Sequence, residues 1–178
     1  MREDPPDTKT TPSSILEELS RSASTGTTGP DRSEPYEISL GSGTADERTR
    51  AEAVERELDE LMERVNGALP TDEVAFDEAI VKENLDEILL MLIALHGETH
   101  GKELLSDLTH LFDAQLSPGT VYPCLHSLEE EGVLSMHAKV RTKEYSIADE
   151  GYVRGTVERA MVQHLAFGLL LYAFLPRL

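Results

Sequence analysis

The stretch Leu116–Leu134, LSPGTVYPCLHSLEEEGVL, decides the fold of this chain of 178 residues. Ser117 is a typical helix N-cap, and Pro118 suits the first helical position, where its missing N–H costs nothing. Apolar side chains then recur on one face, at i, i+4 and i+7: Val121, Leu125 and Leu128. Gly132 provides a left-handed stop. The stretch therefore predicts a helix over residues 118–131 that buries one face in a core.

The opposite face of this predicted helix carries small and mostly uncharged side chains. They are Ser117, Gly119, Thr120, Tyr122 and His126. Such a face can approach base edges without placing carboxylates against phosphates. The pattern is typical of a recognition helix that enters a DNA major groove.

Two helices and a hairpin are predicted around it. Asn84, with Glu87 three residues later, resembles a capping box that opens a helix over 85–96, which Gly97 ends. A second helix spans 101–112. Two short β-prone runs, 133–138 and 143–147, follow the recognition helix. Three helices and a hairpin predict a mainly α-helical fold of the winged helix-turn-helix class over residues 83–151.

The segment before this domain divides into two parts. Residues 1–45 are rich in Pro, Ser, Thr, Gly and acidic residues, so we expect a disordered acidic tail. Residues 46–82 are predicted to be a helical extension. The helical pattern of its first helix starts just before it, at Thr44, and a second, short helix is predicted over Thr71–Val81. The first helix has an apolar stripe that needs a partner, in its own domain or across a dimer: Ala51, Val54, Leu58, Leu61, Val65 and Leu69.

Residues 152–178 are predicted to be a dimerisation helix, part of a longer helix over 149–175. An apolar stripe with a spacing of about four residues runs along it: Val153, Val157, Met161, Leu165, Leu169 and Tyr172. Its last third is apolar all round, and the small domain has too little surface left to cover it. We therefore expect a homodimer with this helix at its centre. The eleven apolar residues Leu165–Leu175 fall short of the roughly 20 that a membrane-spanning helix needs.

The charge of the chain is strongly acidic. Its formal net charge is −18, and only five of its sixteen basic residues are Lys. An acidic, Lys-poor surface suits a cytosol of molar salt, because hydrated carboxylates keep it soluble when repulsion is screened. The composition therefore predicts a halophilic, haloarchaeal protein. The charged N-terminus resembles no signal peptide, so we expect a cytoplasmic location without membrane contact.

No catalytic or metal-binding pattern stands out. Cys124 is the single cysteine and adjoins the buried stripe, so we interpret it as a core residue rather than a redox sensor. His96 and His100 are four residues apart, but Gly97 separates them, which argues against a metal site. We predict no enzyme, no metal and no cofactor.

With these segments in hand, the chain resembles the PadR-like family of winged-helix transcriptional regulators. The resemblance covers residues 84–151 and rests on His100–Leu108 (HGKELLSDL), Leu116–Leu134 and Lys143–Gly151 (KEYSIADEG). It implies sequence-specific binding of double-stranded DNA, dimers built through the C-terminal helix, and repression relieved by a small-molecule effector. It also implies that the third helix and the wing contact DNA.

The predicted DNA-contacting residues combine the recognition helix with a sparse set of cations. The wing is the predicted hairpin over 133–147, and its basic cluster consists of Lys139, Arg141 and Lys143. Lys102 lies at the start of the second helix. The complete set of predicted DNA-contacting residues is Lys102, Ser117, Gly119, Thr120, Tyr122, His126, Lys139, Arg141 and Lys143. Family members often have Arg or Lys where this chain has His126 and Ser127, and a more basic wing. In molar salt this difference costs little, because counterion release contributes almost nothing there.

Two other functions fit parts of the sequence. The net charge of −18 would also suit a winged-helix protein-interaction module that does not bind DNA. The apolar C-terminal third would suit a membrane-tethered regulator. The charge on the recognition face separates the first alternative from a DNA-binding protein, and solubility without detergent separates the second.

Overall fold

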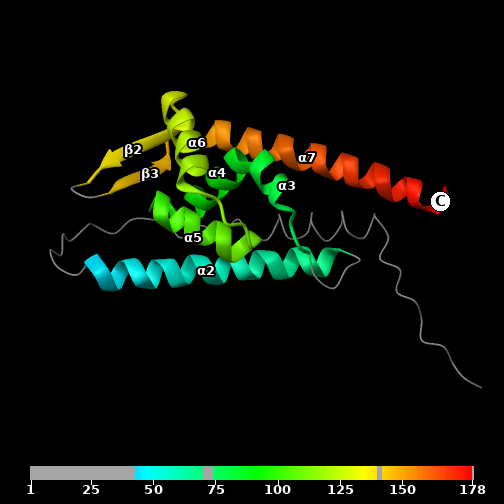
Figure 1. Ribbon diagram of the computed structural model, residues 1–178, viewed down its shortest axis with the longest axis horizontal. Coiled ribbons are helices and arrows are strands. Elements are labelled where there is room, and N and C mark those ends of the chain that lie inside the picture. Colours follow the sequence, from blue (N-terminus) through cyan, green and yellow to red (C-terminus); the bar gives the residue numbers. More distant parts are fainter. Residues whose placement is uncertain (1–42, 70–73, 140–141, 178) are drawn as a thin grey trace, which may run out of the picture.

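The computed structural model describes residues 43–69, 74–139 and 142–177. Figure 1 shows a small sheet at one end of the molecule, helices α4 to α6 beside it, and α2 and α7 along opposite sides. The described elements are α2 (Gly43–Ala68), α3 (Glu78–Glu83), α4 (Leu85–His96), β1 (Glu98–His100), α5 (Gly101–Phe112), α6 (Pro118–Glu130), β2 (Leu134–Ala138), β3 (Lys143–Ile147), α7 (Glu150–Phe174) and the 3-10 turn η1 (Leu175–Arg177).

Helices α4, α5 and α6 enclose the core. The apolar stripe predicted for the recognition helix is buried, since Val121 and Leu125 are 0% exposed and Leu128 is 4% exposed. Leu89, Leu92 and Ile93 of α4 and Leu104 and Leu108 of α5 are also fully buried in the same cluster. Each such side chain contributes about 1.5–3 kcal/mol by leaving water. The helix-turn-helix arrangement is thus held by the residues whose spacing predicted it.

The sheet has three antiparallel strands in the order β1-β3-β2. The predicted hairpin is present: β2 pairs with β3 from Leu134 opposite Ile147 to Ala138 opposite Lys143. Strand β1 was not predicted. Its Thr99 lies opposite Tyr145, and both residues are buried, so β1 ties the entrance of α5 to the base of the wing.

Helix α2 packs on its own domain. Val54 and Leu58 are 5% and 0% exposed within the core cluster, and α2 contacts α4 and α5. The sequence allowed the apolar stripe of this helix to pack either in its own domain or across a dimer, and the structure shows packing in its own domain. The helix begins at Gly43, before the predicted boundary at 46. Residues 1–42, most of the expected disordered tail, lie outside the described residues.

Two predictions around α3 were wrong. Val74–Asp77 have no helical structure, and α3 begins only at Glu78, because Asp77 caps it by accepting a hydrogen bond from Ala79 N–H. Asn84 makes no side-chain cap on α4. Its amide Nδ2 donates to the Ile80 carbonyl instead, and its Oδ1 lies 2.6 Å from Nε2 of His164 in α7. Asn84 therefore links the end of α3 to α7.

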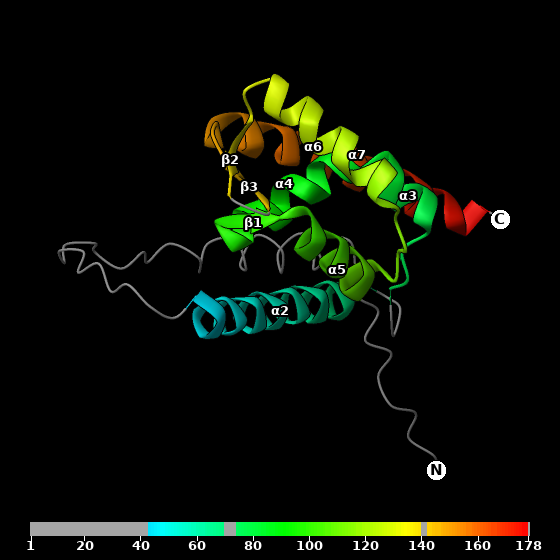
Figure 2. The same ribbon diagram turned by 60° about the vertical axis from the view of Figure 1, so that its left-hand side comes forward.

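Helix α7 crosses α4 and then extends beyond the rest of the domain (Figures 1 and 2). Asp149 caps it through the Tyr152 N–H. None of its residues is buried, and Met161, Leu170 and Phe174 are 50–66% exposed. The segment Glu150–Arg177 is long and apolar enough to span a membrane by length and composition, although the predicted eleven-residue core alone is not. One such helix is weak evidence for a membrane span.

Candidate nucleic-acid interface

The outer face of α6 is accessible along its first turns. Gly119 and His126 are exposed, Tyr122 is 38% exposed, and Thr120 is half-buried. Ser117 occupies the N-cap position but its side chain makes no hydrogen bond to the backbone of the first turn. Its Oγ lies 3.1 Å from Oγ1 of Thr120, so the predicted capping bond is replaced by a contact between two hydroxyls. The predicted contact face is therefore largely free to meet a ligand.

Tyr122 lies across the first residue of α5. A Cβ built on Gly101 would come within 2.5–2.7 Å of three atoms of the Tyr122 ring and hydroxyl. The ring also lines a groove between α6 and β3, and Lys143 contributes to the same groove; its lining is Pro118, Gly119, Tyr122, Pro123, His126, Glu129, Lys143 and Tyr145. Burial raises the pKa of the Tyr145 phenol at the base of this groove. The recognition helix and the wing thus form one continuous surface.

The predicted cations of the wing and of α5 differ in their surroundings. Lys102 and Lys143 are exposed, and neither forms an ion pair within the described part of the chain. Lys139 is exposed as well and forms an ion pair with Glu144, while its backbone N–H donates to the Thr142 carbonyl at 2.8 Å. Arg141 lies outside the described residues. The ion pair reduces the charge that Lys139 offers to a phosphate, so Lys102 and Lys143 are the better placed of the described cations.

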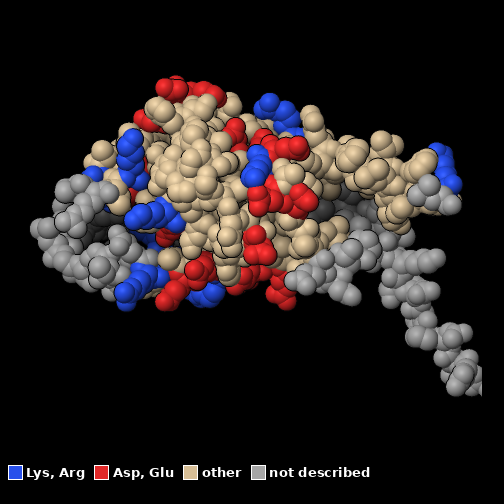
Figure 3. Space-filling model, in the orientation of Figure 1, with Lys and Arg blue, Asp and Glu red and all other residues tan. Residues whose placement is uncertain are grey.

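The acidic residues of α6 gather where the helix ends. Glu129, Glu130 and Glu131 occupy its last turn and C-cap. His126 lies 3.2 Å from Glu129 and 3.6 Å from Glu130, which turns its imidazole toward this acidic end. Figure 3 shows an uncharged surface over the middle of the domain, with basic residues on the side of the wing and acidic residues both at the end of α6 and on the opposite side, over α3. The first turns of α6 therefore present an uncharged surface.

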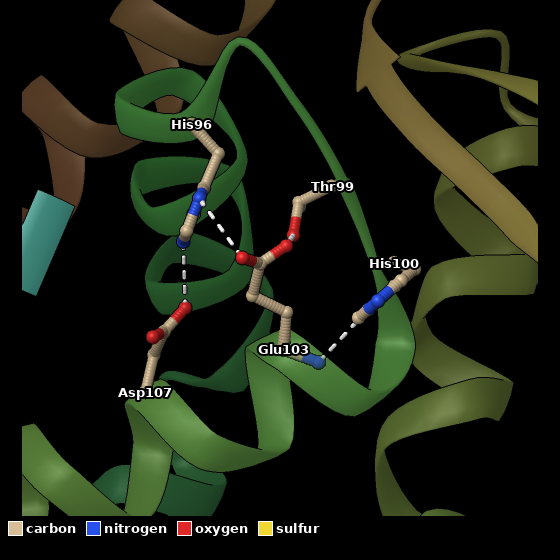
Figure 4. A network of polar contacts seen from close by, with 5 residues as sticks. All are labelled: His96, Thr99, His100, Glu103 and Asp107. Atoms are coloured by element: carbon tan, nitrogen blue, oxygen red, sulfur yellow. Dashed lines mark hydrogen bonds and ion pairs between the residues drawn. The ribbon is translucent and has the colours of Figure 1, made fainter. Parts of the chain in front are cut away.

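A buried polar network that the sequence did not predict joins α4, β1 and α5 behind this surface (Figure 4). Nε2 of His96 lies 2.8 Å from Oδ2 of Asp107, and Thr99 Oγ1 donates to Glu103 Oε2 at 2.7 Å. His100 caps α5 by accepting from the Glu103 N–H. Asp107 could have been found, since it lies beside Leu108 on the apolar face of α5, where an acid needs a partner. In the described part of the chain no three acidic, His or Cys residues form a metal-binding group.

Cys124 packs partly against the core from the inner side of α6. Its Sγ donates to the Thr120 carbonyl at 3.5 Å. Burial, and then the neighbouring Asp86 carboxylate, raise the pKa of its thiol. The thiolate is the reactive form of cysteine, so these surroundings disfavour a redox sensor and agree with the interpretation of Cys124 as a packing residue.

The arrangement of α4, α5, α6 and the β2–β3 hairpin defines a winged helix-turn-helix protein. Residues 89–155 match the model of the transcriptional regulator PadR-like family. This match agrees with the resemblance to the PadR-like family of transcriptional regulators that the sequence motifs predicted. Members of this class are regulators and not enzymes, in agreement with the expectation that this chain is not an enzyme.

Curated relatives come from haloarchaea. The chain is 41% identical over 116 residues to the transcriptional activator GvpE1 of Halobacterium salinarum, covering 65% of this chain and 61% of that protein. It is 47% identical over 91 residues to the transcriptional activator GvpE of Haloferax mediterranei, covering 51% of this chain and 47% of the relative. The chain thus spans less than two thirds of the length of these relatives. Their organisms fit the halophilic character expected from the composition.

A solved structure of a transcriptional regulator from Clostridium thermocellum is also similar. It is 20% identical in sequence, with a TM-score of 0.45 over 53% of this chain and 96% of that structure.

Proposed function

We propose that this protein is a sequence-specific DNA-binding transcriptional activator that works as a homodimer in a high-salt cytoplasm. The observation that carries the proposal is the face of α6: Gly119 and Tyr122 are accessible, and Lys143 of the wing shares a groove with them. The acids of α6 gather at its far end. This charge distribution favours DNA over the alternative of an acidic interaction module, which would need carboxylates across the recognition face.

In the proposed complex, α6 enters the major groove by its N-terminal turns. Thr120 and Tyr122 contact base edges, thymine methyl groups or the backbone, and Ser117 and Gly119 allow close approach of the helix end to a phosphate. The wing, with Lys139, Arg141 and Lys143, contacts the adjacent backbone or minor groove, and Lys102 contacts the backbone beside α5. His126 lies one turn deeper, between the groove and the acidic end of the helix.

The proposed homodimer forms through α7. Most of the predicted stripe is uncovered in the single chain, where Val157 and Leu169 are 37% exposed and Met161 is 50% exposed. Val153, at its start, packs against the core of its own domain. A second copy is the simplest occupant, because each chain offers the same apolar helix and a two-fold axis buries both helices at once. A two-fold dimer calls for an inverted-repeat operator whose half-sites are one helical turn, or ~34 Å, apart.

High salt determines where the affinity comes from. Counterion release provides most of the affinity of basic DNA-binding proteins in dilute salt, and it fades as the salt concentration rises. A chain with a net charge of −18 relies instead on base contacts, groove shape and bridging water. The sparse cations of the surface are consistent with this mode of binding.

The names of the relatives support a proposal for the sign of regulation. The family resemblance implied repression, whereas the similar haloarchaeal proteins are named transcriptional activators. We therefore propose activation. A small-molecule effector stays a prediction from the family resemblance.

The test is selection of a preferred duplex from a randomised DNA pool in concentrated KCl. We expect the wild-type protein to recover an inverted repeat, and Thr120→Ala combined with Tyr122→Ala to abolish this selection. Gln163→Ala, at an exposed position of α7 outside the predicted stripe, is the control and should select the same duplex. A soluble, folded wild-type protein that selects no duplex would reject DNA binding and favour the interaction module.

A further inference from the structure

The contact between Gly101 and Tyr122 joins the two helices of the helix-turn-helix at the proposed DNA surface. Gly101 is the first residue of α5 and is buried. The three heavy atoms nearest to a Cβ at this position are all from Tyr122: Cε1 at 2.5 Å, Cζ at 2.7 Å and Oη at 2.7 Å. A methyl group and the aromatic ring therefore cannot occupy this space together.

Nothing in the backbone of α5 demands glycine at this position. The φ angle of Gly101 lies outside the left-handed region, which in the described chain includes only Gly97 and Gly132 among the glycines. Within a helix, alanine is favoured over glycine, because glycine loses more backbone entropy. The helix would thus accept a side chain here, and the space that the missing side chain leaves is filled by the ring of Tyr122.

We propose that Gly101 is a positioning residue for DNA recognition, which holds the Tyr122 ring across the start of α5 and so fixes its hydroxyl at the surface. This inference rests on the proposed function, because it assigns to Tyr122 a role in contacting DNA. Gly101 itself touches no DNA. Its effect is exerted through the direction in which the Tyr122 side chain leaves α6.

The gain from this arrangement is preorganisation. Tyr122 is 38% exposed, so its ring could rotate into solvent if it did not pack against Gly101. Ordering a free side chain on binding costs conformational entropy, and a ring already held against α5 avoids that cost. This contact also places Tyr122 against the first turn of α5, which carries Lys102, and in the groove that Lys143 lines. One aromatic side chain thereby connects the contacts made by α5, α6 and the wing.

A double-mutant cycle separates positioning from a general structural role. The variants are Gly101→Ala, Tyr122→Ala and the two combined, and the probe is the duplex that wild-type protein selects from the random pool in concentrated KCl. Gly101→Ala should fold, because the atoms it meets are the far end of a half-exposed side chain that can swing outward. Gly155→Ala, at an exposed helical glycine with open space around it, is the matched control.

The expected result has two parts. Gly101→Ala lowers the affinity of otherwise wild-type protein about tenfold but leaves the affinity of the Tyr122→Ala background unchanged. In protein labelled with 3-fluorotyrosine, Gly101→Ala also shifts the fluorine resonance that Tyr122→Ala removes, whereas Gly155→Ala does not. The fluorine readout needs no DNA.

Two results would overturn the inference. If Gly101→Ala lowers affinity equally in both backgrounds, its role is structural and does not act through Tyr122. If Gly101→Ala changes neither the Tyr122 resonance nor the affinity for DNA, the position of the ring does not depend on its contact with Gly101. Failure of wild-type protein to select any duplex would instead reject the proposed function, and the recognition role of this contact with it, while the resonance would still report whether Gly101 holds the ring.

Discussion

His96 of α4 and Asp107 of α5 form a buried hydrogen-bonded pair, with 2.8 Å between Nε2 and Oδ2. Their side chains are 2% and 8% exposed. The pair fixes the first two helices of the helix-turn-helix relative to one another at the point where β1 interrupts them. Because both groups have left water, each depends on the other for its hydrogen bond.

Asp107→Ala should therefore destabilise the fold. It leaves a buried imidazole without this partner, which costs about 1–3 kcal/mol. The chain provides a matched control in His110 and Asp59, another His–Asp pair at 3.0 Å whose side chains are 46% and 66% exposed. Asp59→Ala should change the free energy of unfolding by less than about 1 kcal/mol. Denaturant titrations of both variants in concentrated KCl measure these changes. If both substitutions lowered the free energy of unfolding equally, burial would not determine how much a His–Asp pair contributes to stability.

Local sequence signals predicted the helix-turn-helix and the hairpin. The observed bounds of α4 and α5 match the prediction, because Gly97 provides a left-handed stop and the apolar spacing is regular. The recognition helix ends at Glu130, one residue before its predicted end and two before the expected stop at Gly132. Such features depend on a few neighbouring residues, so they can be inferred without knowing the rest of the fold.

Features that depend on distant residues were missed. Strand β1 has three residues and exists through pairing with β3, more than forty positions away. Asn84 bonds to Ile80 and to His164 rather than capping its own helix. The site followed the same rule: the exposed residues of α6 were predicted from helical spacing, whereas the contact of Tyr122 with Gly101 arises from the crossing of two helices. Spacing on one helix gives no sign of that contact.

Removal of packing atoms from α2 should weaken the whole domain. Leu58 is 0% exposed in the same core cluster as α4 and α5. Leu58→Ala should cost about 2–5 kcal/mol, because it leaves a cavity in that core. Leu69→Ala, at a position that is 40% exposed just after α2, should have little effect. Unfolding should remain a single transition by circular dichroism; unfolding confined to α2, with the remaining domain equally stable, would contradict a shared core.

The reactivity of Cys124 should depend on Asp86. Burial and the Asp86 carboxylate raise the pKa of the thiol, so less thiolate is present at any given pH than in an exposed cysteine. Asp86→Asn removes the negative charge and should lower this pKa, which increases the rate of reaction with Ellman's reagent near pH 8. Glu83→Gln, an exposed acid at the end of α3, is the control. Cys124 is the single cysteine, so the reaction rate reports on it alone. An unchanged rate in Asp86→Asn would show that burial alone raises the pKa of the thiol.

A charged side chain in the predicted apolar stripe of α7 should dissociate the proposed dimer. Met161 is 50% exposed in the single chain, and a carboxylate there would be desolvated between two apolar helices. Met161→Glu should convert a species of twice the 19.7 kDa chain mass into one of that mass, measured by light scattering in concentrated KCl. Gln163→Glu adds the same charge to an exposed position outside the stripe and should remain dimeric. A monomeric wild-type protein, or dimers in both variants, would place the interface elsewhere.

Neutralising the wing should lower specific DNA affinity and flatten its dependence on salt. The variant combines Lys139→Gln, Arg141→Gln and Lys143→Gln. Each phosphate contact that these substitutions remove should reduce the slope of log affinity against log salt by about 0.9, and the already paired Lys139 should contribute least. The control neutralises three cations elsewhere, Arg64, Lys82 and Arg159, and so gives the protein the same net charge. Binding of the selected duplex is measured over a series of KCl concentrations. If both variants flatten the slope equally, the effect belongs to the net charge of the protein, and if neither does, the wing makes no phosphate contact.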